Sequence, residues 1–331
     1  HSPLRAVGAQ LERGVRRRWR GAGQARLVQS EGAVQGVAMG VGEWFSVFCS
    51  SLRMGADQRS NLAYRTGRIA RSVNGYFRGL DSDTAYRFYV GSLGRNTAIP
   101  SISDADLLCE LPAATYHQYH AHAGNGQSAL LTAVRTAIRT TYKTSDVFGD
   151  GQVVVVAFDD GVTYEVLPAF SNTDGGYTFA DASGGGSWRS CKPKQEMDAF
   201  AQRNRTCNAN LVELSRMVRA WRDYNSVPMN GMLIDTLAYQ FIGTWPHRDK
   251  SYLYFDFMTR DFFAFLAGQD KNQNYWLAPG SASYVWRKGA FEYKARQAEL
   301  RALEAIQYQA SGHDWSARQK YREIYGTYFP S

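Results

Sequence analysis

YVGSLGRNTAIPSISDADLLCEL, residues 89–111, is the stretch from which the fold of this chain is predicted. The apolar run 88–90 breaks into Gly91-Ser92. Asp104 and Asp106 then lead a second apolar run. Two apolar runs joined by a polar segment predict two strands, with both polar motifs at one edge of a sheet.

The two aspartates have the spacing of neighbours on one face of a strand. Two carboxylates side by side repel each other, so without a cation one of them tends to keep its proton at neutral pH. Gly91 permits a close approach of the backbone, and we expect Ser92 to cap a following helix whose free N–H groups favour a triphosphate. Each motif alone also fits an ordinary turn or a solvated loop, but the two in order are more specific.

A third carboxylate follows further along the chain. After the turn Asp150-Gly151, residues 153–158 are expected to form a buried strand, 159–161 a hairpin turn and 162–170 the return strand. Glu165 is the only acid on that return strand. We interpret it as the third member of the site, and the alternative is an outward-facing edge residue.

These motifs resemble the Gly-Ser and paired-aspartate signature of the DNA polymerase β-like nucleotidyltransferases. The Gly-rich stretch 173–193, which we expect to be a long functional loop, contains Gly185-Gly186-Ser187-Trp188. It resembles the element that follows the third carboxylate in the bacterial cyclic GMP-AMP synthase-like enzymes, also called CD-NTases of the SMODS type. For Trp188, the alternative is a side chain that fills the core.

The resemblance implies an α+β fold, with a polymerase β-like palm made of a mixed sheet with helices and a C-terminal helical domain. It implies a nucleotidyltransferase core at 39–204 and a helical substrate-binding domain at 205–331. It also implies two Mg²⁺ ions, with Mn²⁺ as a substitute, held by the catalytic acids Asp104, Asp106 and Glu165. The nucleotide-binding residues implied are Gly91, Ser92, Gln152, Ser187, Trp188 and Arg219.

Three positions depart from the family pattern. Many relatives have Asp at the place of Glu165, which is longer by one methylene. Relatives commonly have Lys at the place of Arg219, which keeps the charge and adds a bidentate fork; a solvated basic face is the alternative. Around Gly231-Met232 relatives often have a Ser and an aromatic that stacks on a base, so base selection stays open.

The implied function is a cytoplasmic synthase that joins nucleoside triphosphates, ATP among them, into a cyclic di- or trinucleotide. One metal ion lies on the donor triphosphate and the other, shared with Glu165, lowers the pKa of the acceptor 3′-hydroxyl, which attacks the α-phosphorus as pyrophosphate leaves. In the family this product activates a downstream effector in antiphage defence, and regulatory proteins are possible partners. The alternatives are a nucleotidyltransferase that modifies a protein, an RNA end or a small molecule, and an inactive nucleotide sensor.

Composition is consistent with a folded protein of two domains. Of 331 residues, 44% are hydrophobic and 21% are charged. No apolar run approaches the ~18 residues of a membrane helix, so no membrane is expected as a partner. The four cysteines lie far apart without metal-ligand spacing, which favours free thiols in a reducing cytoplasm.

The net charge of +8 is concentrated in the first 38 residues, which carry seven arginines and two glutamates. The rest of the chain therefore carries only +3, and we expect that nucleic acid is not required. Residues 1–38 lack apolar periodicity, and we expect a disordered basic tail, with an amphipathic targeting peptide as the alternative. Met39 is a candidate start of the native protein.

Overall fold

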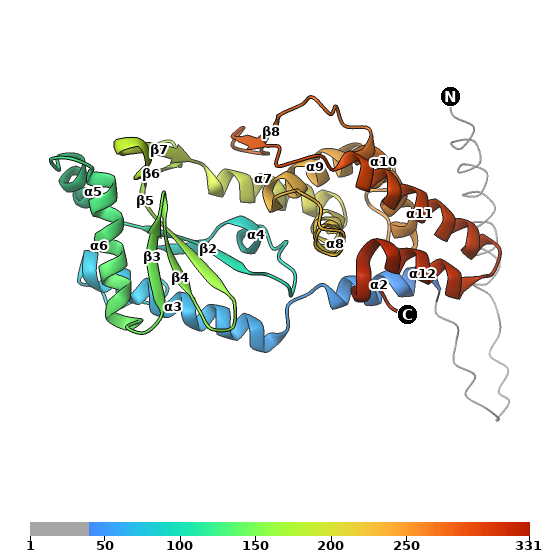
Figure 1. Ribbon diagram of the computed structural model, residues 1–331, viewed down its shortest axis with the longest axis horizontal. Coiled ribbons are helices and arrows are strands. Elements are labelled where there is room, and N and C mark those ends of the chain that lie inside the picture. The colour runs from blue at the N-terminus through green and yellow to red at the C-terminus, as the bar shows by residue number, and fades with distance from the viewer. Residues whose placement is uncertain (1–39) are drawn as a thin grey trace.

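The computed structural model describes residues 40–331, so the predictions for the basic tail lie outside the described residues (Figure 1). One end of the molecule is a mixed sheet with helices and the other end is helical. The sheet with α3 to α6 is called the palm below. The remaining helices, α2 and α7 to α12, are called the helical region.

The palm sheet has the strand order β1-β2-β5-β4-β3, and β6 and β7 extend it from β5. β2 and β5 are parallel, and the other pairs are antiparallel. The strands are β1 (Arg87–Tyr89), β2 (Asp104–Glu110), β3 (Asp146–Asp150), β4 (Val153–Ala157), β5 (Thr163–Ser171), β6 (Tyr177–Asp181) and β7 (Ser187–Cys191).

The palm helices are α3 (Ala56–Arg78), α4 (Gly91–Gly94), α5 (Ala113–His120) and α6 (Gly126–Thr141). α3 ends at Gly79, whose left-handed conformation suits a glycine C-cap. α6 begins at Asn125, whose side chain accepts a hydrogen bond from the Ser128 backbone N–H. Both long helices pack their apolar stripes on one face of the sheet, which leaves the opposite face toward the helical region (Figure 1).

One sequence prediction in the palm is wrong. The stretch 173–193 is not a long loop but contains the hairpin β6–β7 and the start of α7. Tyr177, Phe179 and Ala180 on β6 are buried, while the three glycines 184–186 have positive φ and form the turn through the short 3-10 helix η2 (Ser183–Gly185). The glycines dominate the composition but occupy only the turn, because the flanking residues have enough apolar surface to add two strands.

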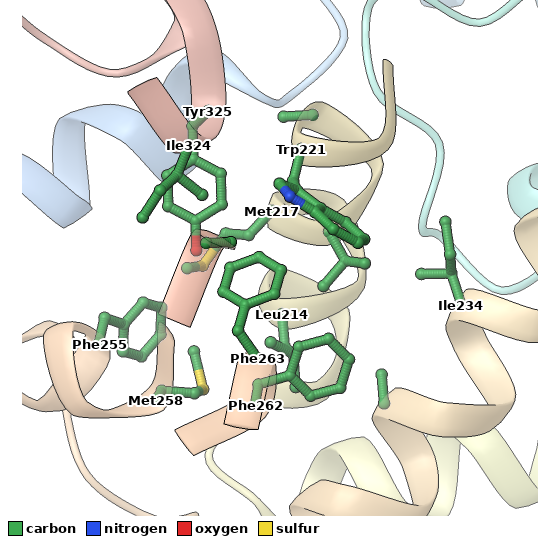
Figure 2. Close-up of a cluster of buried hydrophobic side chains, with 14 of the residues drawn as sticks. Leu214, Met217, Trp221, Ile234, Phe255, Met258, Phe262, Phe263, Ile324 and Tyr325 are labelled. Carbon is green, nitrogen blue, oxygen red and sulfur yellow. The ribbon is translucent and has the colours of Figure 1, made fainter. Parts of the chain in front are cut away.

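The helical region contains α2 (Val41–Ser51), α7 (Pro193–Thr206), α8 (Asn210–Tyr224), α9 (Gly231–Thr244), α10 (Phe255–Ala267), α11 (Glu292–Ala310) and α12 (Asp314–Tyr325). The short elements η3 (Tyr252–Tyr254) and η4 (Gly326–Tyr328) and the hairpin of β8 (Tyr275–Leu277) and β9 (Tyr284–Trp286) complete it. Figure 2 shows its core, where side chains of α8, α10 and α12 interdigitate around Trp221 and Phe263.

α2 packs with the C-terminal helices although its residues precede the palm. Phe45 and Phe48 have ring contacts with Tyr321, Tyr325 and Phe329. The division near residue 205 stays a prediction, and the structure adds that α2 belongs to the helical region although it precedes the palm in the sequence. The predicted fold class, an α+β palm with a C-terminal helical region, is confirmed.

Candidate active site

The parallel pairing of β2 with β5 brings the three predicted catalytic acids together. Asp106 lies directly opposite Glu165 in the strand register, and Asp104 is two residues earlier on the same face. Ala105, which lies between the two aspartates, and its partner Tyr164, which precedes Glu165, point the other way, into the core beneath α3 and α6. The acids therefore project from the sheet face that is turned toward the helical region.

The turn Gly91-Ser92 lies against these acids. Gly91 has φ +58°, and a Cβ atom at this position would overlap the Oδ2 oxygen of Asp106. The backbone also connects the two motifs, since the Val90 N–H donates to the Asp106 carbonyl oxygen at 3.0 Å. Only glycine permits this approach to Asp106, while the predicted role of Gly91 in nucleotide binding stays a prediction.

The predicted cap by Ser92 is wrong. α4 begins at Gly91, so its N-cap residue is Val90, which makes no side-chain cap hydrogen bond. Ser92 lies one residue inside the helix, where its hydroxyl is not placed to accept from the helix N-terminus. Ser92 is one of the residues that line the cleft between the palm and the helical region.

A cleft of about 240 Å³ separates the palm from the helical region. From the palm it is lined by Gly91, Ser92, Arg95, Asp104 and Asp106, and from the helical region by Arg219, Arg222, Asn230, Gly231 and Met232, with 98–99 and 101–103 between them. Glu165 is not part of this lining and lies beyond Asp106 on the sheet. Carboxylates on one wall and guanidinium groups on the other suit a ligand that carries metal-bound phosphates.

Two of the three acids have raised pKa values, and repulsion among the acids contributes to both shifts. Burial, followed by the negative charges of Asp104 and Glu165, raises the pKa of Asp106 to about 6. Burial, followed by Asp104 and Asp150, also raises the pKa of Glu165. The Arg95 guanidinium opposes the shift at Asp106. A cation at this sheet edge would relieve the repulsion.

The donor set fits a hard divalent cation such as Mg²⁺, because it consists of carboxylate oxygens that project from one face of the paired strands β2 and β5. Within residues 40–331, no three His, Cys, Asp or Glu side chains converge closely enough to form a preassembled metal cluster. Like charges on a shared strand face are expected to stand apart when no counterion is bound. Ser103 holds one of the acids in place by donating from its hydroxyl to Asp104 Oδ1 at 2.8 Å.

Arg219 lines the cleft, but its guanidinium is occupied by protein groups. Nη1 and Nη2 donate to the two carboxylate oxygens of Asp235 at 2.6 and 2.9 Å, and Nη2 also donates to the Gly231 carbonyl oxygen at 3.2 Å. The side chain is almost completely buried. The Arg219 guanidinium, which is predicted from the sequence to bind a triphosphate, therefore has an intramolecular partner, the Asp235 carboxylate.

The other three predicted nucleotide contacts lie outside the lining of the cleft: Ser187 and Trp188 are on β7, and Gln152 is in the β3–β4 turn beside the β6–β7 hairpin. Gln152 donates from Nε2 to Asp181 Oδ2 at 3.1 Å, and Ser187 is exposed opposite Asp181 in the strand register. Trp188 packs its ring against Tyr116 and Phe170, with centroid distances of 4.8 and 5.8 Å. Their roles in nucleotide binding stay predictions, and for Trp188 the packing resembles the core-filling alternative.

Residues 39–204 match the family of Second Messenger Oligonucleotide or Dinucleotide Synthetase (SMODS) domains. The chain belongs to this family. The protein is thus a nucleotidyltransferase that makes cyclic oligonucleotides, and the predicted relationship to the bacterial cyclic GMP-AMP synthase-like enzymes is confirmed. No curated protein matches the sequence.

Solved structures share the fold of this SMODS enzyme at low sequence identity. CdnC of E. coli MS115-1, solved with ATP and in a complex with HORMA-deltaN, is 14% identical with a TM-score of 0.63 in the ATP structure, over 87% of this chain and 98% of that chain. Vibrio cholerae DncV, a cyclic AMP-GMP synthase solved with the linear intermediate 5′-pppA(3′,5′)pG, is 13% identical with a TM-score of 0.62, over 85% and 93%. CdnG of Bradyrhizobium diazoefficiens, solved with GTP, is 10% identical with a TM-score of 0.59, over 87% and 96%.

Two charged residues of this site in the SMODS enzyme were not predicted from the sequence. Arg95 follows α4 directly and lines the cleft, and Asp235 is completely buried on α9. A signal for Asp235 exists, because it is the only charged residue in the apolar helix GMLIDTLAYQFIGT, and a buried charge needs partners.

Among the helices of residues 40–331, none has an apolar stretch of the length needed to cross a bilayer.

Proposed function

We propose that this protein joins nucleoside triphosphates, with ATP among them, into a cyclic di- or trinucleotide. The observation that carries the proposal is the register that sets Asp106 opposite Glu165 at the edge of a cleft with guanidinium groups on its far wall. The solved neighbours with ATP, GTP and a linear dinucleotide intermediate support the choice of nucleotides as substrates.

Asp104, Asp106 and Glu165 are the residues that would hold Mg²⁺. When bound there, the ions supply Lewis-acid chemistry, which lowers the pKa of the acceptor hydroxyl and neutralises charge on the triphosphate. The chain itself orients the donor between the Gly91-Ser92 turn and the helical region. The acceptor hydroxyl then attacks the α-phosphorus in line, a new P–O bond forms, and the bond to pyrophosphate breaks.

The arginines of the cleft contribute a positive wall. Arg95 and Arg219 share one carboxylate, that of Asp235, so these three groups carry one excess positive charge, which Glu196 Oε2 offsets in part from 3.9 Å away from Arg95 Nη1. Arg222 lies at the rim and pairs with its neighbour Asp223 at 2.7 Å. This surplus favours the polyanionic donor and the pyrophosphate that leaves.

The test is product analysis with purified full-length protein, NTPs and Mg²⁺ or Mn²⁺, followed by phosphatase treatment and mass spectrometry. We expect a phosphatase-resistant cyclic product from NTPs alone, and none from a variant with Asp104→Asn and Asp106→Asn. Labelling that appears only when a protein, RNA or small-molecule acceptor is added would point to the other nucleotidyltransferase class. NTP binding without any turnover would point to an inactive sensor.

We also propose that the product acts as a second messenger on an effector in antiphage defence. A HORMA protein bound to CdnC supports the idea that a regulatory protein contacts the synthase. Co-expression with the neighbouring genes under phage challenge tests this role. Protection that persists with the double Asp104→Asn and Asp106→Asn variant would contradict it.

A further inference from the structure

The three residues that follow α4 each bond to the helical region. Arg95 donates from Nε to Asp235 Oδ2 at 2.8 Å, and Thr97 donates from its hydroxyl to the same oxygen at 3.1 Å. Between them, the Asn96 side-chain oxygen accepts from Arg216 Nη2 at 2.9 Å. A segment of the palm is thus held at three consecutive positions by side chains of α8 and α9. These five residues are called the Asp235 clamp below.

Asp235 is the centre of the clamp. Its side chain is fully buried and accepts hydrogen bonds from Arg95, Thr97 and both terminal nitrogens of Arg219. Burial by itself would raise the pKa of this carboxyl, but the Arg219 and Arg95 guanidiniums hold it below the ordinary value. Because Oδ2 accepts three of these hydrogen bonds and Oδ1 accepts the fourth, the carboxylate is held in one orientation.

The clamped segment holds the turn of the active site. The Ser92 carbonyl oxygen accepts from the Thr97 backbone N–H at 2.8 Å and from that of Ala98 at 3.3 Å. Gly91, the residue before, lies against Asp106 Oδ2. A short chain of contacts therefore leads from Asp235 through Thr97 and the Gly91-Ser92 turn to a catalytic carboxylate.

We propose that Asp235 and Arg216 are positioning residues, which fix the Gly91-Ser92 turn against Asp106 so that the cleft is in shape before the donor nucleotide binds. The inference deepens the proposed function and rests on it. Neither Asp235 nor Arg216 lines the cleft, so both act through the 95–97 segment and not on the substrate.

Two variants remove single contacts of the clamp without emptying the core. Thr97→Val keeps the size of the side chain and removes the hydroxyl, which donates to Asp235 at 3.1 Å and also lies 3.5 Å from the Ser92 carbonyl oxygen. Asn96→Gly suits the backbone φ of +58° and removes the acceptor of Arg216. In each variant we expect the amides of Thr97 and Ala98 to exchange about tenfold faster and KM for the NTP to rise about tenfold. A factor of about ten corresponds to the loss of one hydrogen bond to a charged group.

Matched variants separate positioning from stability. Asn96→Asp keeps an acceptor for Arg216 and tolerates the left-handed conformation, so it should exchange and bind as wild type does. Thr259→Val removes a buried hydrogen bond of 2.9 Å to the Tyr325 hydroxyl, inside the helical region and outside the clamp. It should lower the melting temperature and leave amide exchange at 91–98 and KM unchanged.

Hydrogen exchange on the nucleotide-free protein and KM are measured for all four variants. If Thr97→Val and Asn96→Gly behave as Thr259→Val does, with a lower melting temperature alone, the clamp only stabilises the fold and the proposal is wrong. Slower turnover with an unchanged KM and unchanged exchange would also overturn it. Wild-type protein that binds no NTP would instead refute the proposed function, while the exchange data would still report whether the clamp holds the turn.

Discussion

Gly91 and Asp106 are packed so closely that a single added methyl group on Gly91 would overlap the Oδ2 oxygen of the carboxylate. The glycine is the first residue of the four-residue helix α4, and the aspartate is on the neighbouring strand β2. The contact ties the position of a proposed catalytic acid to the backbone that we propose faces the donor nucleotide. It also makes Gly91 the most sensitive glycine of the site.

Gly91→Ala is expected to lower activity by about 100-fold while the protein still folds. The new Cβ displaces Asp106, and misplacement of a reacting group by ~1 Å costs about that factor. The positive φ adds about 1–2 kcal/mol of strain. Steady-state kinetics and thermal melting check this. Gly75→Ala in α3 is the control, since a Cβ there meets no atom within 4 Å and alanine favours a helix; equal activity in both variants would contradict the role of the contact.

Asp106→Asn is expected to abolish synthesis and to stabilise the metal-free protein at pH 8. The folded-state pKa of Asp106 is raised from 3.8 to about 6, so its protonation stabilises the fold below pH ~4, and this stability is lost as the pH rises through about 6. At pH 8 the ionised carboxylate then costs on the order of 2–3 kcal/mol. The amide removes that cost.

Melting curves at pH 5 and pH 8, with and without Mg²⁺, check the Asp106 prediction. The variant should melt higher than wild type at pH 8, and the difference should shrink at pH 5. Mg²⁺ should raise the melting temperature of wild type more than that of the variant. A variant that melts lower than wild type at pH 8 without metal would argue against repulsion among the acids.

Glu165→Gln is expected to retain NTP binding and lose synthesis. Asp104, Asp106 and the Gly91-Ser92 turn line the cleft, whereas Glu165 lies beyond Asp106, on the side where we place the acceptor. Calorimetry with Mg²⁺ and a non-hydrolysable ATP analogue measures binding, and product formation measures catalysis. Glu165→Asp, which restores the common family residue, should keep measurable activity. If the Gln variant lost binding as well, Glu165 would support the whole site.

Arg219→Lys is expected to destabilise the protein by about 1–3 kcal/mol, although lysine is common among relatives at this place. A lysine ammonium cannot span both oxygens of the buried Asp235 and the Gly231 carbonyl as the guanidinium fork does. Thermal or urea unfolding measures the loss. Arg222→Lys, at the partly exposed pair with Asp223, should have little effect on stability. Unchanged stability of Arg219→Lys would favour a direct triphosphate contact as the main role.

A protein that begins at Met39 is expected to fold and to synthesise product as the full chain does. Residues 1–38 carry seven arginines and little apolar surface to offset the ordering entropy of about 1–2 kcal/mol per residue. Melting temperature and product yield of the two forms are compared at low and high salt, with and without added DNA or RNA. A large effect of truncation that weakens with salt would show that the arginines recruit a polyanion.

Several local elements of this protein follow from the sequence alone, although the start of α4 and the hairpin within 173–193 do not. Alternation with period two predicts that Asp104 and Asp106 share a strand face, and the turn signal at 159–161 predicts the hairpin that carries Glu165. Gly91 is likewise predicted at a close approach of backbone and ligand. These features depend on neighbours within a few residues, and therefore a short window of sequence contains the information.

The tertiary structure alone decided which distant segments meet. The sequence predicts an acid on β5, but only the parallel pairing with β2 sets Glu165 opposite Asp106. Arg219 is predicted to face a triphosphate, yet the packing of α8 on α9 brings it to Asp235. The same carboxylate also accepts a hydrogen bond from Arg95. Trp188 stands in a glycine-rich run, yet folds into an aromatic cluster. The packing free energy of the whole chain selects such partners. Local periodicity does not encode which distant charge or ring will lie beside a given buried side chain.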